Sequence, residues 1–345
     1  MSTAQRKIKV LVVDDSLVFR EIIVRGLAQD SQIEVVATAM DPYDARDKIL
    51  AYRPDVMTCD IEMPKMNGIE FIRRLLPQYP LPVIVISTTS GAVFDALNAG
   101  AVEFLSKPDL SSRRHIQHFL ADLAVKIKIA ANSKIRVAGA PAQAVQLQSP
   151  PGTSTYSRQV IAIGSSTGGT EALAYLLKHL PADIPAILIA QHIPPVFSRL
   201  FAERLNAQTA FTVKEAESGD VLEAGKVFIA PGNRHLRLKQ QGRRYLTEVA
   251  AGEKVNGHCP SVDVLFESVA AVAGDKAVGI ILTGMGADGA RGMLQLRRRG
   301  ARTIGQDEQS SVVYGMPKVA YEIGAVEKQA SLSEIPDLLL EVLSR

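Results

Sequence analysis

The N-terminal part of the chain alternates short apolar runs with amphipathic segments. Between residues 9 and 108 the runs are "KVLVV", "IEVVATA", "DVMTCD", "VIVIS" and "EFLSKP". The segments between them have helical periodicity, as at residues 42–52. Strands that are apolar on both faces are typical of a parallel sheet covered by helices on both sides. The pattern therefore predicts a doubly wound α/β domain over residues 1–128.

The alternation stops at residue 129 and starts again at residue 158. Residues 129–157 are rich in Ala, Gln, Ser, Pro and Gly and lack sustained periodicity, which is typical of an interdomain linker. The strands expected after it are "VIAIG", "AILIAQH", "KVFIAPG", "AVGIILTG" and "RTIGQD", with helices at residues 170–179 and 287–299. "LRLKQQGRRYLTEVA" predicts a polar antiparallel hairpin. We therefore expect a second, mostly parallel α/β domain over residues 158–345.

Composition narrows the class of protein. A chain of 345 residues exceeds the size at which one core usually divides in two. The net charge of +3 and the lack of a basic face or a terminal helix-turn-helix pattern argue against nucleic-acid binding. Cys59 and Cys259 form neither a disulfide framework nor a metal-binding spacing. No apolar stretch reaches the roughly 18 residues of a membrane span, and we expect a cytoplasmic enzyme or regulator.

Polar side chains follow four strands of the first domain. They are Asp14 and Asp15, then Asp60, Ser87 and Lys107. The carboxyl ends of parallel strands meet at one edge of a sheet, so these groups are expected to gather there. Three neighbouring carboxylates favour Mg²⁺, and a carboxylate beside Mg²⁺ is able to attack a phosphoryl donor. Taken singly, each residue also fits a helix cap, a turn or a solvated charge.

The stretch "VIAIGSSTGGT" has a glycine pattern that suits several chemistries. A P-loop would need Lys and Ser/Thr where Thr170 and Glu171 stand, and a dinucleotide-binding turn would need glycine in place of Ser166. The pattern G-x-S-x-G does match residues 164–168, between an expected strand and helix. It makes Ser166 a candidate nucleophile, whereas Ser165 is expected to be structural.

A nucleophilic serine needs a base and an orienting acid. Among six histidines, His192 alone closes an apolar strand of the second domain, and Asp288 lies at the mouth of "AVGIILTGMGADGARGM". Backbone N–H groups near Met285 offer part of an oxyanion hole. The order Ser166, His192, Asp288 differs from the Ser–acid–His order of α/β-hydrolases. Singly, His192 also fits a hydrogen-bonded loop histidine and Asp288 a helix N-cap.

Two sets of motifs carry a resemblance to known families. "VVDDS", "DIEMPKMNG" and "FLSKP" resemble the signature of a response-regulator receiver domain over about residues 8–125. "IGSSTGGTEAL", "AQHIPPVF", "APGNRHL", "CPSVDVLF", "LTGMGADGARGM" and "SVVYGMPK" resemble the catalytic domain of chemotaxis protein-glutamate methylesterases of the CheB type, over residues 158–345. The resemblance implies a flavodoxin-like receiver followed by a Rossmann-like α/β catalytic domain.

For the first domain, the resemblance implies phosphorylation on Asp60 by a histidine kinase. Mg²⁺ would be held by Asp14, Asp15 and Asp60. Ser87 would supply the switch hydroxyl, and Lys107 would contact the phosphoryl group.

For the second domain, the resemblance implies that Ser166 is the nucleophile, His192 the base and Asp288 its orienting partner. Thr167 and the backbone of Met285 would assist around the oxyanion. Hydrolysis would need no cofactor.

The implied reaction is the demethylation of glutamate methyl esters, and the deamidation of specific glutamines, on the cytoplasmic domain of chemoreceptors during adaptation. Phosphorylation would activate it, and the protein would meet the membrane only through the receptor. The family usually has alanine at the position of Ser165. The residues leave open a non-catalytic response regulator that acts through partner binding, and a broader esterase or amidase.

Overall fold

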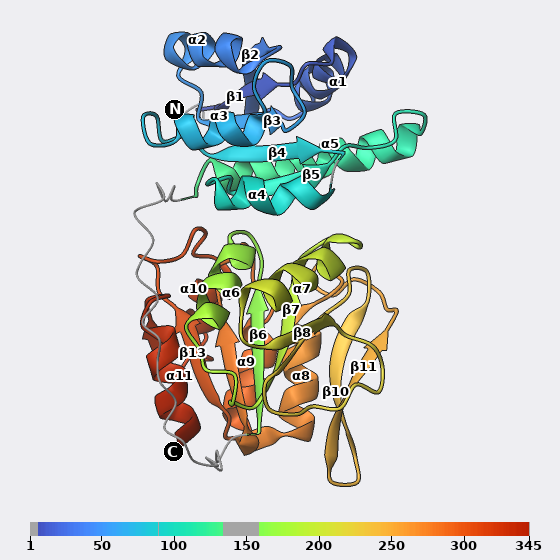
Figure 1. Cartoon of the computed structure of the whole chain (residues 1–345), viewed down its shortest axis with the longest axis vertical. Helices are drawn as coiled ribbons and strands as arrows, with labels where there is room; N and C mark the ends of the chain where they lie inside the picture. Colours follow the sequence, from blue (N-terminus) through green and yellow to red (C-terminus); the bar gives the residue numbers. More distant parts are fainter. Residues whose placement is uncertain (1–5, 89, 134–158, 345) are drawn as a thin grey trace, which may run out of the picture. The chain divides into compact units, whose positions relative to one another are not determined.

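The structure is a computed structural model in which residues 6–88, 90–133 and 159–344 are described. The chain divides into two compact units, before and after a boundary at residues 141 and 142 (Figure 1). The predicted linker starts within the last helix of the first unit, which ends at Ala130, and residues 134–157 of it lie outside the described residues. The domain limits given above therefore stay a prediction.

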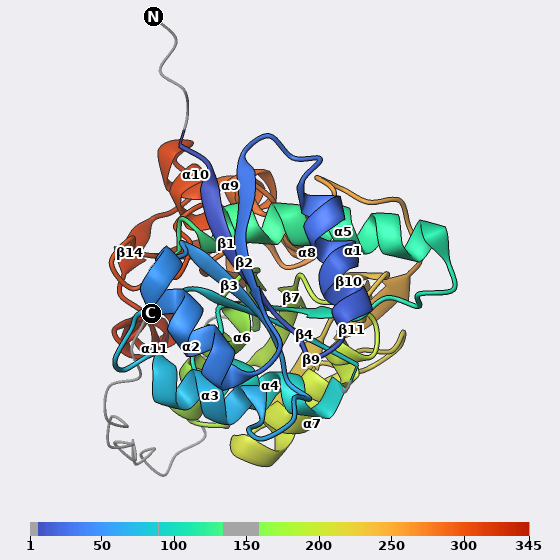
Figure 2. The same cartoon turned by 90° about the horizontal axis from the view of Figure 1, so that it is seen from above.

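The first unit is a five-stranded parallel sheet in the order β2-β1-β3-β4-β5. Its strands are β1 (Ile8–Val13), β2 (Ile33–Ala39), β3 (Val56–Asp60), β4 (Val83–Ser87) and β5 (Glu103–Ser106). Its helices are α1 (Leu17–Leu27), α2 (Pro42–Tyr52), α3 (Gly68–Leu75), α4 (Val93–Asn98) and α5 (Arg113–Ala130), with a 3₁₀ turn at Ser90–Ala92. Figure 2 shows α1 and α5 on one face and α2, α3 and α4 on the other. The predicted doubly wound fold is confirmed.

Helices α1, α2, α3 and α5 start where a short polar side chain accepts a backbone N–H group, whereas α4 has no side-chain cap. The hydroxyl of Ser16 caps α1, and the carboxylate of Asp41 caps α2, in which Pro42 follows at the first helical position. Phe19 of α1 packs on Phe119 of α5 with ring centroids 5.5 Å apart. The aromatic contact holds α1, which directly follows β1, against α5.

The second unit has a seven-stranded parallel sheet in the order β14-β13-β12-β6-β7-β9-β8. Its strands are β6 (Val160–Ser165), β7 (Ala186–Gln191), β8 (Thr212–Glu215), β9 (Lys226–Ile229), β12 (Ala277–Ile281), β13 (Arg302–Gln306) and β14 (Lys328–Ala330). Its helices are α6 (Gly169–Lys178), α7 (Phe197–Gln208), α8 (Val262–Val272), α9 (Ala290–Arg298), α10 (Met316–Glu322) and α11 (Ile335–Ser344), with a 3₁₀ turn at Gly274–Lys276. The edge strands β8 and β14 were not predicted, because they are short and largely polar.

The predicted hairpin is also confirmed. Strands β10 (His235–Gln241) and β11 (Arg244–Ala250) pair antiparallel from His235 with Ala250 to Gln241 with Arg244. The backbone N–H of Leu238 in β10 donates to the hydroxyl of Ser268 in α8, at 2.9 Å. The hairpin is thereby tied to the helix that lies against the central sheet.

The chain order of the large sheet reverses at β6, which lies between β12 and β7. All three strands are buried along their whole length, as strands covered on both faces require. Gly164 of β6 lacks a side chain where one would meet Val262, since a Cβ there would lie 2.1 Å from the Cγ1 of that residue. The first turn of α8 therefore lies close against β6, at the edge where ligands bind in open α/β sheets.

In the described parts of the chain, no helix combines the length and the apolar character that crossing a membrane demands.

Candidate functional site

The end of β6 brings Ser166 next to residues from two neighbouring strands. Ser165 and Gln191 are partners in the parallel register of β6 and β7, and the N–H of His192 donates to the carbonyl of Ser165 at 3.1 Å. On the other side, the N–H of Ser166 donates to the carbonyl of Thr283, which follows β12, at 3.0 Å. Ser166 thus lies between the carboxyl ends of β7 and β12.

The two adjacent serines differ in how their hydroxyls are placed. Ser165 is fully buried, and its Oγ donates to the side-chain oxygen of Gln191 at 2.6 Å. The amide nitrogen of Gln191 in turn donates to the carbonyls of Ser166 and His192, both at 3.0 Å. Ser166 is only half-buried. The hydroxyl of Ser165 is therefore bonded inside the fold, whereas Ser166 is the serine that stays in partial contact with solvent.

Glycines make room for this turn. Gly168 has a left-handed backbone with φ of 76° and directly precedes α6, so the first N–H groups of the helix lie at the turn. A Cβ on Gly284 would lie 2.7 Å from the Cβ of Ser166. Only glycine at 284 lets the loop after β12 approach the candidate nucleophile so closely.

His192 and Asp288 come together although 96 residues separate them. The Nε2 of His192 lies 2.8 Å from Oδ2 of Asp288, and the side chains are 8% and 1% exposed. Nδ1 of His192 is buried and has no hydrogen-bond partner among the described residues. With an ionised Asp288, Nε2 carries the proton that is donated to the carboxylate, and Nδ1 is left with its lone pair.

Asp288 does not cap the helix that follows it, so that alternative is wrong: the N-cap of α9 is Gly289, and no side chain caps it. The carboxylate instead accepts hydrogen bonds at the start of α8. Besides His192, its donors are the N–H of Val262 at 2.7 Å, the N–H of Asp263 at 3.2 Å, Oγ of Ser261 at 2.8 Å and Nδ2 of Asn256 at 2.9 Å.

This set of donors decides the charge of Asp288. Burial raises the pKa of its carboxyl group, but the hydrogen bonds from His192, from Asn256 and from the N–H of Val262 together hold the pKa well below its usual range. The positive end of the α8 dipole acts in the same direction. Asp288 is therefore an anion next to the imidazole.

Thr167 and Met285, the two residues expected around an oxyanion, belong to the turn after β6 and to the loop after β12. Thr167 is buried, and its carbonyl accepts the hydroxyl of Thr283 at 3.0 Å. The carbonyl of Gly284 accepts the N–H of Met316 at 2.7 Å and that of Gly315 at 3.1 Å, which fixes the backbone just before Met285. The side chain of Met285 is 45% exposed.

Three neighbours of the site were not predicted from the sequence. Asn256 and Ser261 donate to Asp288, and the ring of His258 lies parallel to that of His192, with centroids 3.6 Å apart and an interplanar angle of 7°. "NG" at 256–257 is a recognisable turn signal. The sequence holds no signal that this turn lies beside β7.

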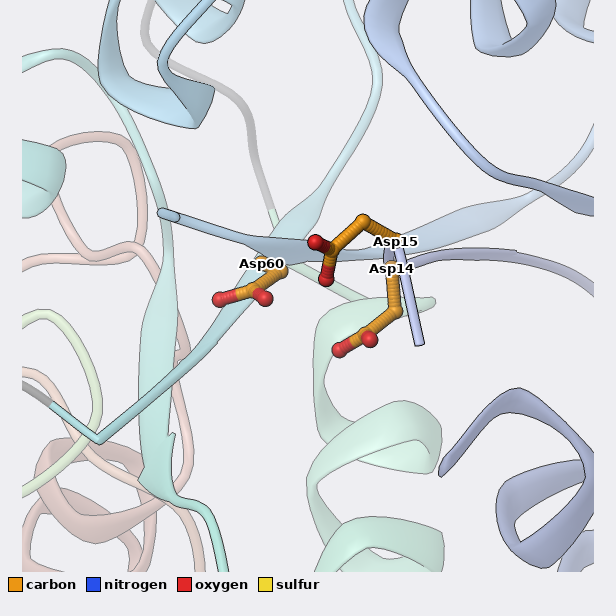
Figure 3. Close-up of side chains that lie close together, drawn as sticks. All are labelled: Asp14, Asp15 and Asp60. Carbon is orange, nitrogen blue, oxygen red and sulfur yellow. The ribbon is translucent and has the colours of Figure 1, made fainter. Parts of the chain in front are cut away.

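The first unit gathers its own cluster at the ends of β1 and β3. Asp14, Asp15 and Asp60 each offer a carboxylate oxygen, and these oxygens lie within 4.8 Å of one another (Figure 3). Asp14 and Asp60 are buried, whereas Asp15 is exposed. Hard carboxylate ligands at this spacing fit a Mg²⁺ ion, which usually keeps several waters besides one or two carboxylates.

Lys107, just after β5, reaches into the cluster. Its Nζ lies 2.8 Å from Oδ2 of Asp14 and 2.6 Å from Oδ2 of Asp60, and Ser87 is buried at the end of β4. Burial raises the pKa of Asp60, and the hydrogen bond from Lys107 only partly opposes this. Burial lowers the pKa of Lys107, but Asp14 and Asp60 outweigh it and raise that pKa. Lys107 is thus a cation placed against two carboxylates.

Comparison with known proteins agrees with both units. The CheB methylesterase family model matches residues 161–339, and the response regulator receiver domain model matches residues 10–139. A protein-glutamate methylesterase/protein-glutamine glutaminase 2 of Syntrophomonas wolfei is 56% identical, over 99% of each chain. A protein-glutamate methylesterase/protein-glutamine glutaminase of Syntrophotalea carbinolica is 47% identical, over 98% of each chain.

A solved structure supports the fold of the second unit. The CheB methylesterase catalytic domain of Thermotoga maritima is 38% identical with a TM-score of 0.52, and the match covers 54% of this chain and 98% of that one. These matches do not favour a non-catalytic regulator. The chain belongs to the CheB methylesterase family, with a response regulator receiver domain ahead of the methylesterase domain.

Proposed function

We propose that Ser166, His192 and Asp288 are the nucleophile, base and orienting acid of a protein-glutamate methylesterase and protein-glutamine glutaminase. The relatives carry this name over nearly the whole chain. The observation that carries the assignment of residues is the 2.8 Å contact between Nε2 of His192 and the buried carboxylate of Asp288, beside the half-buried Ser166.

In the proposed acylation, Oγ of Ser166 attacks the carbonyl carbon of a glutamate methyl ester while its proton passes to His192. Nδ1 is the accepting atom, because Nε2 is already bonded to Asp288. The tetrahedral intermediate collapses, the bond to the methoxy oxygen breaks, and His192 returns the proton so that methanol leaves. The ionised Asp288 stabilises the imidazolium that forms between these steps.

Water then attacks the glutamyl ester of Ser166. His192 takes a proton from the water, the bond between the acyl carbon and Oγ breaks, and Oγ regains the proton. The product on the substrate protein is an unesterified glutamate side chain. A glutamine side chain follows the same route, with ammonia as the leaving group.

We assign the oxyanion to the turn between β6 and α6 together with the loop after β12. The backbone N–H of Met285 and Thr167 are the proposed donors. Support comes from the fixed carbonyl of Gly284 and from the start of α6 directly after Gly168, where the helix dipole favours negative charge.

For the receiver unit we propose phosphorylation on Asp60, with Mg²⁺ held by Asp14, Asp15 and Asp60. When bound, Mg²⁺ supplies positive charge that neutralises the incoming phosphoryl oxygens. Lys107 adds a fixed cation on the same side, and the hydroxyl of Ser87 is the proposed switch partner of the phosphoryl group.

The proposed partners follow from the two units. A histidine kinase is the proposed phosphodonor, and the cytoplasmic domain of a methyl-accepting chemoreceptor is the proposed substrate. The proposed site of action is therefore the cytoplasm, with membrane association only through the receptor.

The test is methanol release from methylated receptor. Ser166→Ala should lower kcat by at least about 10⁴-fold, as loss of a triad nucleophile does. Ser165→Ala is the matched control, because its buried hydroxyl donates to Gln191, and it should keep kcat within a few-fold of the parent. The assignment fails if Ser166→Ala retains kcat.

A further inference from the structure

The ring of His258 covers one face of the proposed base. His192 and His258 lie with centroids 3.6 Å apart and planes 7° from parallel, which is a full face-to-face overlap at van der Waals distance. His258 is half-buried. Such close parallel stacking of two imidazoles restricts the tilt of each ring.

A single hydrogen bond does not hold an imidazole in one plane. The bond from Nε2 of His192 to Asp288 fixes one atom, and the ring remains able to rock about the line that joins the two residues. Nδ1 of His192 is the atom that would accept the proton from Ser166, and it lies on the other side of the ring nitrogen pair from the bond to Asp288. It has no hydrogen-bond partner among the described residues. A second constraint is needed to aim it, and a flat ring against the imidazole supplies one.

His258 is the last residue of a tight turn that starts at Val255. Val255 and His258 exchange both backbone hydrogen bonds, at 3.0 and 2.9 Å, and the two residues between them have left-handed backbones, with φ of 53° at Asn256 and 84° at Gly257. Positive φ at both central positions is the geometry of a type I′ turn, for which Asn-Gly is the preferred sequence. The turn is therefore rigid for a local reason.

The same turn is fastened to the acid. Nδ2 of Asn256 donates to Oδ1 of Asp288 at 2.9 Å and to Oδ2 of Asp263 at 2.8 Å. Oδ1 of Asn256 accepts from Arg291 at 3.2 Å. The four-residue turn thus contacts both partners of the proposed pair. The side chain of Asn256 binds the carboxylate of Asp288, and the ring of His258, two residues later, stacks on His192.

We propose that His258 is a positioning residue that holds the imidazole of His192 in the plane in which Nδ1 faces the hydroxyl of Ser166. The proposal rests on the proposed function, because it takes His192 to be the base. His258 acts through its ring face and exchanges no proton with the substrate. A flat, uncharged aromatic ring should therefore replace it in part, and an aliphatic side chain should not.

The experiment uses the full-length protein and methylated receptor, with methanol release followed at several substrate concentrations. His258→Leu replaces the imidazole with an aliphatic side chain of similar size and no ring, and kcat should fall about ten- to a hundredfold with KM changed less than threefold, because a misaimed base slows the chemical step. His258→Phe restores a flat ring and should recover kcat to within about fivefold of the parent. Thermal unfolding of each variant reports whether the fold is kept.

His179→Ala is the matched control. His179 stacks on Tyr175 with centroids 4.1 Å apart, so this variant removes a stacked histidine at a place away from the triad. Its kcat should equal that of the parent.

Two outcomes would overturn the proposal. If His258→Leu keeps the parent kcat, the ring does not position the base. If His258→Phe is as inactive as His258→Leu while both unfold at the parent temperature, His258 acts by proton transfer or hydrogen bonding instead. Ser166→Ala is measured in parallel. Full activity of Ser166→Ala would show that the proposed function is wrong, whereas an inactive Ser166→Ala with either result above would show that only the role of His258 is wrong.

Discussion

At the scale of single residues, the second unit assigns different tasks to side chains of the same type. Ser165 and Ser166 are adjacent, yet the hydroxyl of Ser165 is bonded to Gln191 in the interior, whereas Ser166 is a half-buried residue at a strand end. The G-x-S-x-G spacing already favoured Ser166. Which hydroxyl is bonded inside the fold depends on the register of β6 with β7, and no pattern within the motif carries that information.

Asp288 should be as important for stability as for catalysis. Asp288→Asn would place an amide against several N–H and O–H donors, and at least one donor would lose its partner. We expect a loss of about 2–4 kcal/mol in the free energy of unfolding, as for breaking a buried charged network. Activity should fall by roughly 10⁴-fold, because the imidazole loses its orienting anion. Chemical denaturation and methanol release measure the two effects separately.

The pH dependence of that stability has a defined sign. The pKa of Asp288 is held below its unfolded value, so its contribution is fully present above about pH 4 and is lost as the pH falls toward the folded pKa. The difference in unfolding free energy between parent and Asp288→Asn should therefore shrink on going from pH 6 to pH 3. A difference that stays constant over this range would contradict the charge assigned to Asp288.

Ionisation of Asp60 is expected to lower the free energy of unfolding, whereas ionisation of Asp288 raises it. The folded pKa of Asp60 is raised, so its ionisation costs stability above its unfolded pKa, and the cost disappears once both states are protonated at low pH. Asp60→Asn should unfold at a higher temperature than the parent at pH 7, and this advantage should vanish near pH 3. Calorimetry of the transition of the first unit measures it, and a lower midpoint at pH 7 would count against the burial argument.

At the scale of elements, the candidate site is assembled by helix ends and turns around the centre of a sheet. The predicted strands at this centre agree with the structure to within a few residues, because fully buried strands give continuous apolar runs. The short edge strands β8 and β14 escaped prediction since "TVKE" and "KQA" have no such run. The start of α8 as the partner of Asp288 also escaped it, because residues 261–263 and 288 are brought together only by the packing of α8 on β6.

Close approach of the loop after β12 can be tested at Gly284. Gly284→Ala would place a Cβ 2.7 Å from the Cβ of Ser166 and 2.4 Å from Sδ of Met316. We expect a loss of about 1–3 kcal/mol in unfolding free energy, as for overpacking, and a large loss of kcat because Ser166, the proposed nucleophile, is displaced.

Gly286→Ala is the comparison for this change. A Cβ at 286 meets nothing within 4 Å, but its backbone has φ of 90°, so the substitution strains the loop without touching Ser166. It should lower stability and retain more of kcat than Gly284→Ala. Equal kcat values for the two variants would mean that contact with Ser166 is not the cause.

At the scale of the whole molecule, one chain joins a response regulator receiver unit to a methylesterase unit. Strand-end patterns predicted that the residues of both candidate sites lie together, because the carboxyl ends of parallel strands meet at one edge of a sheet. The substrate could not be read from the residues and came from family resemblance. The turn that carries Asn256 and His258 was missed, since its local signal says nothing about the strand it faces.

Communication between the units gives a prediction of its own. A small-molecule phosphodonor with Mg²⁺ should raise kcat/KM for methanol release in the parent and leave kcat/KM of Asp60→Asn unchanged.

Mg²⁺ alone at about ten times its dissociation constant should raise the free energy of unfolding of the first unit by about 1.4 kcal/mol, because it binds only the folded cluster. Stabilisation of equal size in Asp14→Ala would contradict the proposed metal site.

The proposed covalent intermediate on Ser166 is tested most directly by rapid quenching of the full-length protein during turnover of a receptor peptide that carries a glutamate methyl ester. Cleavage after Arg158 and Lys178 releases residues 159–178, which contain both serines, and fragmentation mass spectrometry then locates the acyl group. We expect a glutamyl ester on Oγ of Ser166 that forms as methanol is released and is then hydrolysed by water. Methanol release without an adduct, or an adduct on Ser165, would contradict this expectation.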